Sequence, residues 1–319
     1  MLGPPPSAPF DPGLLRLGAD LRRRGAGPSP RTHARVRRGV WMDKVAWAGL
    51  TPVQRHAALV QASALCRLGN APAVFCRSSA AAVHGLPRVS SWPATVSTLI
   101  EGDPVAPSGY VRRVPGEHRA LVLQHGLLVT SVARTIIDLA AVAPLADVVA
   151  AADYALRFGL VSRAELLAEV DRLPPGTRGR RVAGLAVQLA HGLSMSVGES
   201  LSKVQMFLLN VPRPVLQQEF HDEAGLIGQA DFDWPERKVI GEFDGRVKYG
   251  VEPGADAADA LWREKRREDR LRRRGRDVCR WVWAEAIDRD RLGRLLADHG
   301  IRPQPRNRWF SVGETRTSP

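Results

Sequence analysis

Cysteine is scarce in this sequence and follows no metal-binding pattern. The three cysteines, Cys66, Cys76 and Cys279, lie far apart and are odd in number. This arrangement excludes a disulfide framework and the paired Cys/His spacing of a zinc module. Scattered free thiols suit a reducing compartment, so we expect a cytoplasmic protein.

Long apolar runs and a secretion signal are also missing. No stretch stays apolar over the length that a transmembrane helix needs, which argues against a membrane protein. Three prolines at positions 4–6 occupy the place where a signal segment carries its apolar part. We expect residues 1–12 to form a disordered tail, because they are rich in proline.

Acidic residues are fewer than basic residues in this sequence. The chain has 46 Lys and Arg against 33 Asp and Glu, which gives a formal net charge of +13. A surplus of this size predicts a polyanionic partner, and nucleic acid before a membrane surface. The alternative is an arginine-rich genome, which inflates the charge without any functional partner.

The length allows two domains. The 319 residues, 44% of them hydrophobic, have the composition of a globular protein. The breaker cluster P-P-G-T-R-G-R at 174–180 marks a boundary. We predict an α/β protein with an N-terminal α+β region over 13–173, a linker and helix over 174–193, a second domain over 194–302 and a tail over 303–319.

The first region begins with a basic segment. Residues 14–24 carry leucines at helical spacing and end in three arginines before a glycine, which predicts a helix. Residues 31–40 alternate basic residues with small or apolar ones, which predicts a basic β-hairpin. As the wing of a winged helix, this hairpin would contact phosphates through Arg35, Arg37 and Arg38. The alternative is a solvated hairpin without a partner.

Three segments of this region carry a resemblance. They are C-R-S-S-A-A-A-V-H-G-L-P at 76–87, V-T-S-V-A-R-T-I-I-D-L-A at 129–140 and A-A-D-Y-A-L-R-F-G-L-V-S at 151–162. Over roughly residues 14–170 the chain resembles actinobacterial proteins related to the AbiEi-type antitoxins of type IV toxin–antitoxin systems. The resemblance implies a winged-helix region that binds DNA, and a cognate toxin protein as a partner. His84 could be catalytic, but a packing or capping role is the interpretation we favour.

The second domain has an informative order of elements. We predict a helix over 196–209, a strand over 214–220, two strands joined by a turn at 235–237, a helix over 256–274, a strand over 278–283 and a helix over 288–299. A three-strand meander followed by a crossover helix and a further strand gives a mixed sheet with helices packed on it.

The two strands beside the turn are rich in acids. Side chains alternate along a strand, so Asp231 and Asp233 share one face, and Glu242 and Asp244 share a face of the next strand. Carboxylates brought this close repel one another, and a divalent cation relieves the repulsion. The alternative is that these acids pair with arginines on a solvated face.

A second resemblance to a known family rests on four sequence motifs of this domain. They are G-E-S-L-S-K at 198–203, G-Q-A-D-F-D-W-P at 228–235, V-I-G-E-F-D-G-R-V-K-Y at 239–249 and E-K-R-R-E-D-R-L-R-R-R-G at 264–275. Over roughly residues 195–290 the chain resembles the PD-(D/E)XK nuclease superfamily, in the branch related to very-short-patch repair endonucleases. The resemblance implies a restriction-endonuclease-like α-β-β-β-α-β fold and a Mg²⁺ or Mn²⁺ ion held by Glu199, Asp231 and Glu242.

Asp244 stands where that superfamily usually has a catalytic lysine. The resemblance places Asp244 in the catalytic set, and Lys248 is our candidate for the role of the lysine, with Lys265 or Arg270 as alternatives. Arg246 and Arg270 are candidate contacts to nucleic acid.

Each acid also has a local structural alternative. Glu199 stands three residues after Ser196, the spacing of a capping box. Asp233 could pair with Arg237, and Asp244 could serve as a turn residue.

These patterns together predict a metal-dependent endonuclease that acts on DNA. A non-catalytic DNA-binding regulator with a vestigial nuclease fold is the alternative. A third hypothesis is an antitoxin that acts through a protein partner. 

Overall fold

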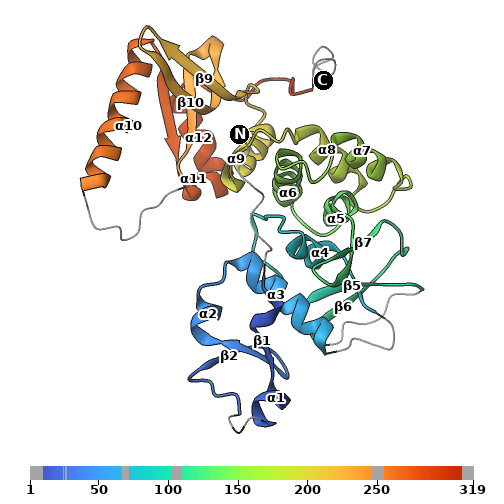
Figure 1. Ribbon diagram of the computed structural model, residues 1–319. Helices are drawn as coiled ribbons and strands as arrows, with labels where there is room; N and C mark the ends of the chain where they lie inside the picture. Colours follow the sequence, from blue (N-terminus) through green and yellow to red (C-terminus); the bar gives the residue numbers. More distant parts are fainter. Residues whose placement is uncertain are drawn as a thin grey trace. The chain divides into compact units, whose positions relative to one another are not determined.

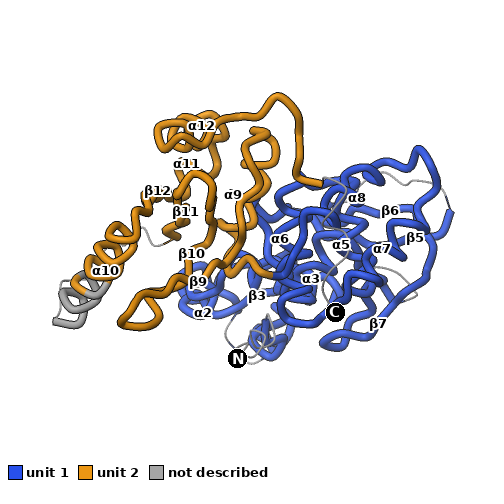
Figure 2. Tube along the Cα trace, turned by 90° about the horizontal axis from the view of Figure 1, so that it is seen from above, with its two compact units in different colours: residues 1–192 blue, residues 193–319 orange. Residues whose placement is uncertain are grey.

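The computed structural model describes residues 10–23, 25, 27–66, 72–102, 109–245 and 255–310. The chain forms two compact units, residues 1–192 and 193–319 (Figure 2). Both contain helices and strands, so the predicted α/β class is confirmed. In the described part of the chain, no helix is both long and apolar enough to cross a membrane.

The first unit begins with a three-stranded antiparallel sheet, in the order β1-β3-β2 (Figure 1). Its elements are η1 (Pro12–Leu14), β1 (Leu15–Leu17), α1 (Gly18–Arg23), β2 (His33–Arg37), β3 (Val40–Asp43), α2 (Lys44–Ala48) and α3 (Pro52–Leu65). The predicted basic hairpin is β2–β3. The predicted helix over 14–24 is wrong in its first half, because Leu15 and Leu17 pair with β3, and this pairing overrides the helix propensity of leucine.

Residues 10–12, which belong to the predicted disordered tail, have a defined structure. Phe10 is only 4% exposed and packs in a core cluster with Val40 and Met42. Asp11 caps the following turn, since its side chain accepts a hydrogen bond of 2.8 Å from the backbone N–H of Gly13. The expectation for residues 1–12 is therefore corrected from residue 10 onward, because an apolar side chain there is buried.

The rest of the first unit is a five-stranded mixed sheet with helices. Its strands are β4 (Val74–Phe75), β5 (Val96–Ile100), β6 (Val111–Pro115), β7 (Leu121–Gln124) and β8 (Leu127–Thr130), in the order β6-β5-β4-β8-β7. Its helices are α4 (Arg77–Val83), α5 (Val132–Leu139), α6 (Leu145–Arg157), α7 (Arg163–Asp171) and α8 (Arg180–Leu189). Helix α8 lies in the predicted linker over 174–193, and it packs on α6 and α7 within the first unit.

His84 has a structural role in this unit. Its Nε2 lies 2.7 Å from the backbone carbonyl oxygen of Thr130, and burial lowers the pKa of the ring. The ring therefore links the end of α4 to β8, which agrees with the packing role that we favoured.

The second unit has the predicted order of elements. They are α9 (Val197–Leu208), β9 (Val215–Asp222), β10 (Gly225–Trp234), η2 (Pro235–Arg237), β11 (Val239–Phe243), α10 (Ala255–Arg273), β12 (Asp277–Trp281), α11 (Trp283–Ile287) and α12 (Arg289–Asp298). The sheet order is β12-β11-β10-β9, with β11 and β12 parallel and the other pairs antiparallel. The predicted mixed sheet is confirmed. Figure 1 shows α10 on one side of this sheet and α9, α11 and α12 on the other.

Two glycines allow close packing on this sheet. A Cβ at Gly198 in α9 would lie 1.9 Å from the ring of Phe243, and one at Gly241 would lie 2.7 Å from the ring of Trp281. The indole N–H of Trp281 donates a hydrogen bond of 2.8 Å to Ser202 of α9. These contacts fix α9 against β11 and thereby fix the position of Glu199.

Candidate carboxylate site of the second unit

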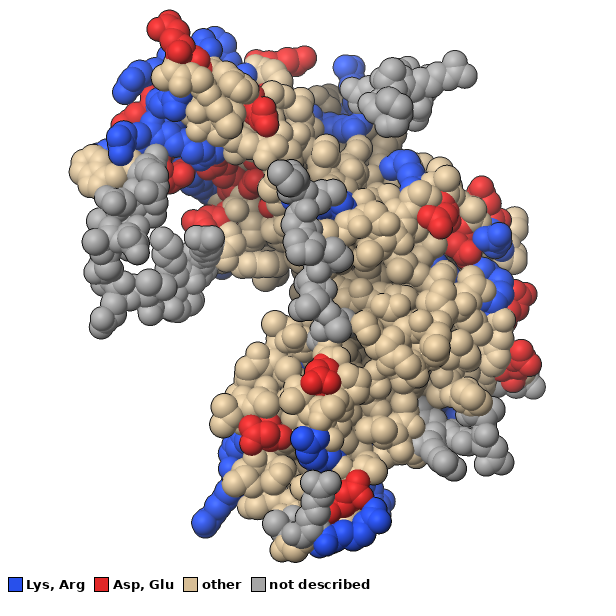
Figure 3. Space-filling model, viewed as in Figure 1, with Lys and Arg blue, Asp and Glu red and all other residues tan. Residues whose placement is uncertain are grey.

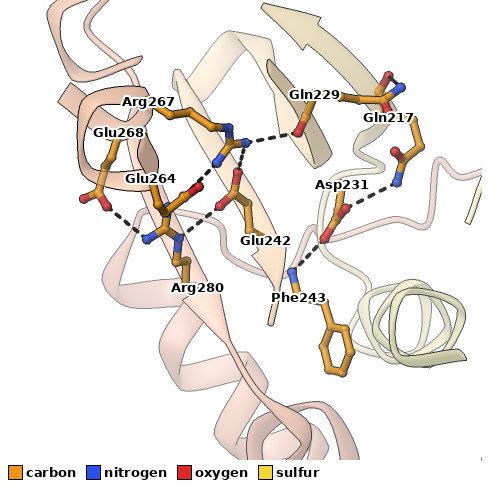
Figure 4. Close-up of polar contacts among 9 residues, drawn as sticks. All are labelled: Gln217, Gln229, Asp231, Glu242, Phe243, Glu264, Arg267, Glu268 and Arg280. Carbon is orange, nitrogen blue, oxygen red and sulfur yellow. Dashed lines mark hydrogen bonds and ion pairs between the residues drawn. The ribbon is translucent and has the colours of Figure 1, made fainter. Parts of the chain in front are cut away.

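A row of polar side chains crosses the sheet of the second unit. It consists of Gln217 on β9, Asp231 on β10, Glu242 on β11 and Arg280 on β12 (Figure 4). Glu242 is paired with Arg280 in the parallel ladder. Because Phe232 is paired with Gly241, the residues one step further along the two strands, Asp231 and Glu242, lie next to each other. The sheet thus brings together two of the predicted metal ligands.

Glu242 lies between two guanidinium groups. Its Oε1 accepts a hydrogen bond from Arg267 of α10, and its Oε2 accepts one of 3.0 Å from Nε of Arg280. Burial alone would raise the pKa of the Glu242 carboxyl, but the two guanidinium groups together lower it below its ordinary value. The side chain is therefore held as a carboxylate.

The ion pairs continue onto helix α10. Arg267 also lies 3.0 Å from Glu264, and Nη1 of Arg280 donates a hydrogen bond of 3.0 Å to Glu268. Arg280 contacts Glu264 as well. These contacts form a network that ties α10 to β11 and β12.

Arg267 reaches Glu242 by passing over Gly228. A Cβ at Gly228 would lie 2.6 Å from Nε of Arg267, and the residue has φ +155° next to a β-bulge in β10. Nη2 of Arg267 donates a further hydrogen bond of 3.1 Å to the carbonyl oxygen of Gln229. Glycine at this position therefore leaves the path open for the guanidinium.

Asp231 is held by neutral donors. Its Oδ2 accepts a hydrogen bond of 2.8 Å from the backbone N–H of Phe243, and its Oδ1 accepts one of 3.3 Å from Nε2 of Gln217. Burial raises the pKa of Asp231, and the neighbouring charge of Glu242 raises it further. A positive charge next to Asp231 would therefore stabilise the ionised form of its carboxyl.

Gln217 joins two of the predicted acids. Its Nε2 donates to Glu199 at 2.9 Å as well as to Asp231. Its backbone has φ +53°, and Gln229 donates a hydrogen bond of 3.0 Å to its carbonyl oxygen. For a residue other than glycine this conformation costs roughly 1–2 kcal/mol, and such strain is concentrated at functional sites.

Glu199 is buried at the start of α9 and is 6% exposed. Its carboxylate accepts a hydrogen bond of 2.7 Å from the backbone N–H of Met195, and its own N–H donates one of 3.2 Å to Ser196. Ser196 therefore caps the N-terminus of α9. The Glu199 carboxylate itself accepts hydrogen bonds from the backbone N–H of Met195 and from Gln217. It reaches Asp231 through Gln217.

Two other predicted site residues that the structure describes, Asp244 and Arg270, are not part of the polar row. Asp244 is exposed just past β11, and its backbone N–H donates to the carbonyl oxygen of Trp281 at 2.9 Å. Arg270 pairs with Asp222 at 2.7 Å, which occupies its guanidinium away from Glu242. Lys248 and Arg246 lie outside the described residues.

Two further side chains considered from the sequence also have other contacts. Asp233 is 2% exposed and pairs with Arg276 at 2.9 Å, in place of the expected Arg237. Lys265 lies with its Nζ 5.4 Å from the ring centroid of Trp262. Neither joins the polar row.

The basic hairpin of the first unit presents two of its three candidate arginines. Arg35 and Arg38 are exposed. Arg37 turns its guanidinium over the ring of Tyr110, 6.0 Å from the centroid, and its Nε and Nη1 are buried without a hydrogen-bond partner in the described part of the chain. Figure 3 shows basic side chains over the lower end of this unit, where β2 and α1 lie.

Sequence reasoning missed Gln217, Arg267 and Arg280. Arg280 lies on a strand that the sequence predicts, but the sequence does not show that this strand pairs with β11 so that Arg280 lies opposite Glu242. Arg267 lies in a run of charges that reads as a solvated helix face, and Gln217 carries no signal in the sequence. All three depend on which strands and helices become neighbours.

The structure brings two of the three predicted metal ligands, Asp231 and Glu242, next to each other. In phosphoryl-transfer sites Mg²⁺ is commonly bound by one or two carboxylates, with waters and substrate phosphates as its other ligands. Asp231 and Glu242 match that pattern, because they are neighbours and the pKa of Asp231 is raised. Within the described residues no three Asp, Glu, His or Cys side chains are grouped to hold a metal ion.

Comparison with known proteins gives relatives without an assigned activity. No family model matches the chain, and no solved structure matches it. Two proteins of Mycobacterium tuberculosis, from strains CDC 1551 and H37Rv, are each 27% identical to it over 229 residues, which is 72% of this chain and 81% of theirs. Both are named only as uncharacterized proteins. The similar region is longer than the 192 residues of the first unit, so it extends over parts of both units.

Proposed function

We propose that the second unit hydrolyses phosphodiester bonds of DNA with the help of Mg²⁺ or Mn²⁺. The observation that carries this proposal is the neighbouring pair of Asp231 and Glu242, in which the pKa of Asp231 is raised and both residues are half-buried. Arg267 and Arg280 already supply positive charge to Glu242, whereas Asp231 accepts hydrogen bonds from neutral donors, so a cation beside both carboxyls would mainly stabilise the anion of Asp231. The resemblance of this unit to PD-(D/E)XK nucleases assigns it the same chemistry.

The protein side chains have separate roles in this proposal. Asp231 and Glu242 would hold the ion, which supplies an activated water and stabilises the leaving oxygen. Gln217 orients Asp231 and connects it to Glu199. Arg267 and Arg280 place guanidinium groups beside Glu242, and guanidinium groups bind phosphate oxygens through paired N–H donors.

The first unit would supply additional affinity for DNA. Its basic hairpin presents Arg35 and Arg38, and the chain carries a net charge of +13. In this function the first unit is an AbiEi-like winged-helix region of a cytoplasmic protein, with DNA and a cognate toxin protein as its partners. Phosphate contacts of this kind position a duplex without reading its sequence.

A second candidate function is a DNA-binding regulator without nuclease activity. Two observations favour it. Both oxygens of Glu242 are engaged by arginines, as in a structural ion pair, and an exposed Asp244 stands in the place of the usual lysine. A regulator of this kind would bind DNA in a salt-dependent manner and cleave nothing.

Cleavage assays separate the two candidates. Supercoiled plasmid, mismatched duplex and single-stranded DNA are incubated with the protein and Mg²⁺ or Mn²⁺, and the wild type is compared with Asp231→Asn, Glu242→Gln and the control Glu219→Gln. Glu219 is exposed on β9, two residues from Gln217. We expect cutting that needs metal, is lost in the first two variants and is kept in the control, while all four proteins still bind DNA. DNA binding without cutting by the wild type would reject the nuclease and favour the regulator.

A further inference from the structure

The first unit contains two adjoining cavities far in sequence from the carboxylate row. Their volumes are about 120 Å³ and about 580 Å³, and both are lined by Arg77, Arg112 and Val142. The larger cavity falls in the range of small-molecule binding sites, roughly 300–1,000 Å³. It is formed by segments around 77, 112, 137–142 and 173–178.

Three arginines of this cavity are unpaired. The side chains of Arg77, Arg112 and Arg178 make no hydrogen bond and no salt bridge to any residue that the structure describes. Other arginines nearby are paired: Arg88 contacts Asp147, and Arg134 contacts Asp138. These three guanidinium groups therefore have no hydrogen-bonded or ion-pair partner among the described residues, and an anion would supply one.

The backbone is constrained at or next to two of these arginines, Arg77 and Arg178. Arg77 has φ +52° at the start of α4, a conformation that costs roughly 1–2 kcal/mol for an L residue. Gly179, which follows Arg178, packs so closely on α5 that a Cβ there would lie 2.6 Å from the backbone of Ala140. The turn that carries Arg178 is also closed by a hydrogen bond of 3.1 Å from the N–H of Arg180 to Thr177.

The rest of the wall is apolar with one acid. Ile137, Ala141, Val142 and Leu173 provide the apolar surface. Asp138 lies in the same wall, 3.3 Å from Arg134, and Thr177 adds a hydroxyl group. An apolar wall beside three guanidinium groups suits a flat ring attached to phosphates.

We infer that this cavity binds a nucleotide, with its phosphates on Arg77, Arg112 and Arg178 and its base against the apolar wall. The site is separate from the carboxylate row, and it gives the first unit a small-molecule ligand in addition to DNA. Phosphates of nucleic acid share the same chemistry, so the test must distinguish the two sources.

Calorimetric titration of the full chain with ADP, with pyrophosphate and with a short DNA duplex tests the inference. Arg112→Ala and Arg178→Ala are the test variants, because both side chains are exposed and their removal breaks no hydrogen bond or ion pair to a described residue. Arg113→Ala and Arg181→Ala are the matched controls, since neither side chain lines the cavity. We expect ADP to bind more tightly than pyrophosphate, and each test variant to weaken ADP binding by at least about tenfold, as for hydrogen bonds to charged groups.

Four results would overturn the inference. The first is the absence of ADP binding to the wild type. The second is an equal loss of ADP binding in the control variants, which would mean attraction by net charge alone. The third is duplex binding that depends on Arg112 and Arg178 while ADP fails to compete with it, which would make the cavity a contact for nucleic acid. Equal affinity for ADP and pyrophosphate would likewise remove the role of the apolar wall.

Discussion

Arg267 of helix α10 and Glu242 of strand β11 form an ion pair in which both side chains are largely buried, 19% and 14% exposed. The pair is possible because Gly228 leaves the guanidinium a path across β10. In this ion pair the guanidinium of Arg267 neutralises the Glu242 carboxylate, which a metal ion would need as a ligand. The same contact therefore links α10 to β11 and limits the access of a metal ion to Glu242.

The first prediction concerns the stability of this pair. Arg267→Ala leaves Glu242 with Arg280 alone, and we expect the free energy of unfolding to fall by about 1–3 kcal/mol, the usual loss for a charged hydrogen bond in a partly buried place. Urea unfolding measures this loss. Arg266→Ala, an exposed neighbour on α10, should change it by less than about 0.5 kcal/mol. Equal effects of the two variants would contradict the prediction.

The second prediction concerns competition between Arg267 and a metal ion. Because Arg267 holds Oε1 of Glu242, its removal should strengthen Mn²⁺ binding by several-fold, on the order of 1 kcal/mol. Glu242→Gln and Asp231→Asn should each weaken it. Electron paramagnetic resonance of free Mn²⁺ measures the affinities. Weaker Mn²⁺ binding in Arg267→Ala would show that the arginine supports the ion instead of competing with it.

The third prediction concerns pH. The pKa of Glu242 lies below its ordinary 4.5, so its contribution to stability is present above about pH 4.5 and is lost as the pH falls through the lowered pKa. The pKa of Asp231 lies above its ordinary 3.8, so its charged form costs stability at neutral pH, and protonation relieves that cost as the pH falls.

Two variants should therefore respond to pH with opposite signs. The stability lost in Glu242→Gln should stay constant from pH 7 to about pH 4.5 and shrink only below that pH, whereas any stability gained in Asp231→Asn should be largest at pH 7 and shrink toward pH 4. Urea unfolding between pH 7 and about pH 3 provides the measurement. Parallel pH profiles for both variants would contradict the opposite directions of the two pKa shifts.

The fourth prediction concerns the strained glutamine. Gln217→Gly relieves a backbone held at φ +53°, whereas Gln218→Gly on the same strand relieves nothing. Gln217→Gly and Gln217→Ala both lose the hydrogen bonds to Glu199 and Asp231, so we expect the glycine variant to be the more stable of the two by about 1–2 kcal/mol, whereas Gln218→Gly should be less stable than Gln218→Ala by about 0.5–1 kcal/mol. Cleavage should fall in both Gln217 variants and in neither Gln218 variant, because only the former lose the amide that orients Asp231. Urea midpoints and plasmid nicking rates give the two readouts.

The fifth prediction concerns the basic hairpin. Each phosphate contact contributes about 0.9 to the slope of log affinity against log salt concentration. Arg35→Ala and Arg38→Ala should each lower the slope for duplex binding by about that amount. Arg37→Ala should leave the slope unchanged, because its guanidinium lies over Tyr110. Titrations of labelled duplex at several salt concentrations test this, and an unchanged slope in all three variants would remove the hairpin from the DNA interface.

Local patterns in the sequence predicted much of the second unit. The turn at 235–237, the alternation that places Asp231 and Glu242 on their strands, and the element order that yields a mixed sheet were all readable from residue periodicity. In the first unit the same reasoning failed at Leu15–Leu17, where pairing with β3 outweighed the helix propensity of leucine.

Periodicity and charge are properties of short segments, so the sequence by itself determined the α/β class, the basic charge, the position of the hairpin and the acids of the carboxylate row. Only the tertiary structure decided what those acids touch. Whether Glu242 meets a lysine, a metal ion or the guanidinium groups of Arg267 and Arg280 depends on how α10 crosses the sheet and how β12 aligns with β11. The same holds for the arginine cavity, whose walls come from segments up to a hundred residues apart along the chain. Contacts between distant segments are set by packing of the whole unit, which no local pattern encodes.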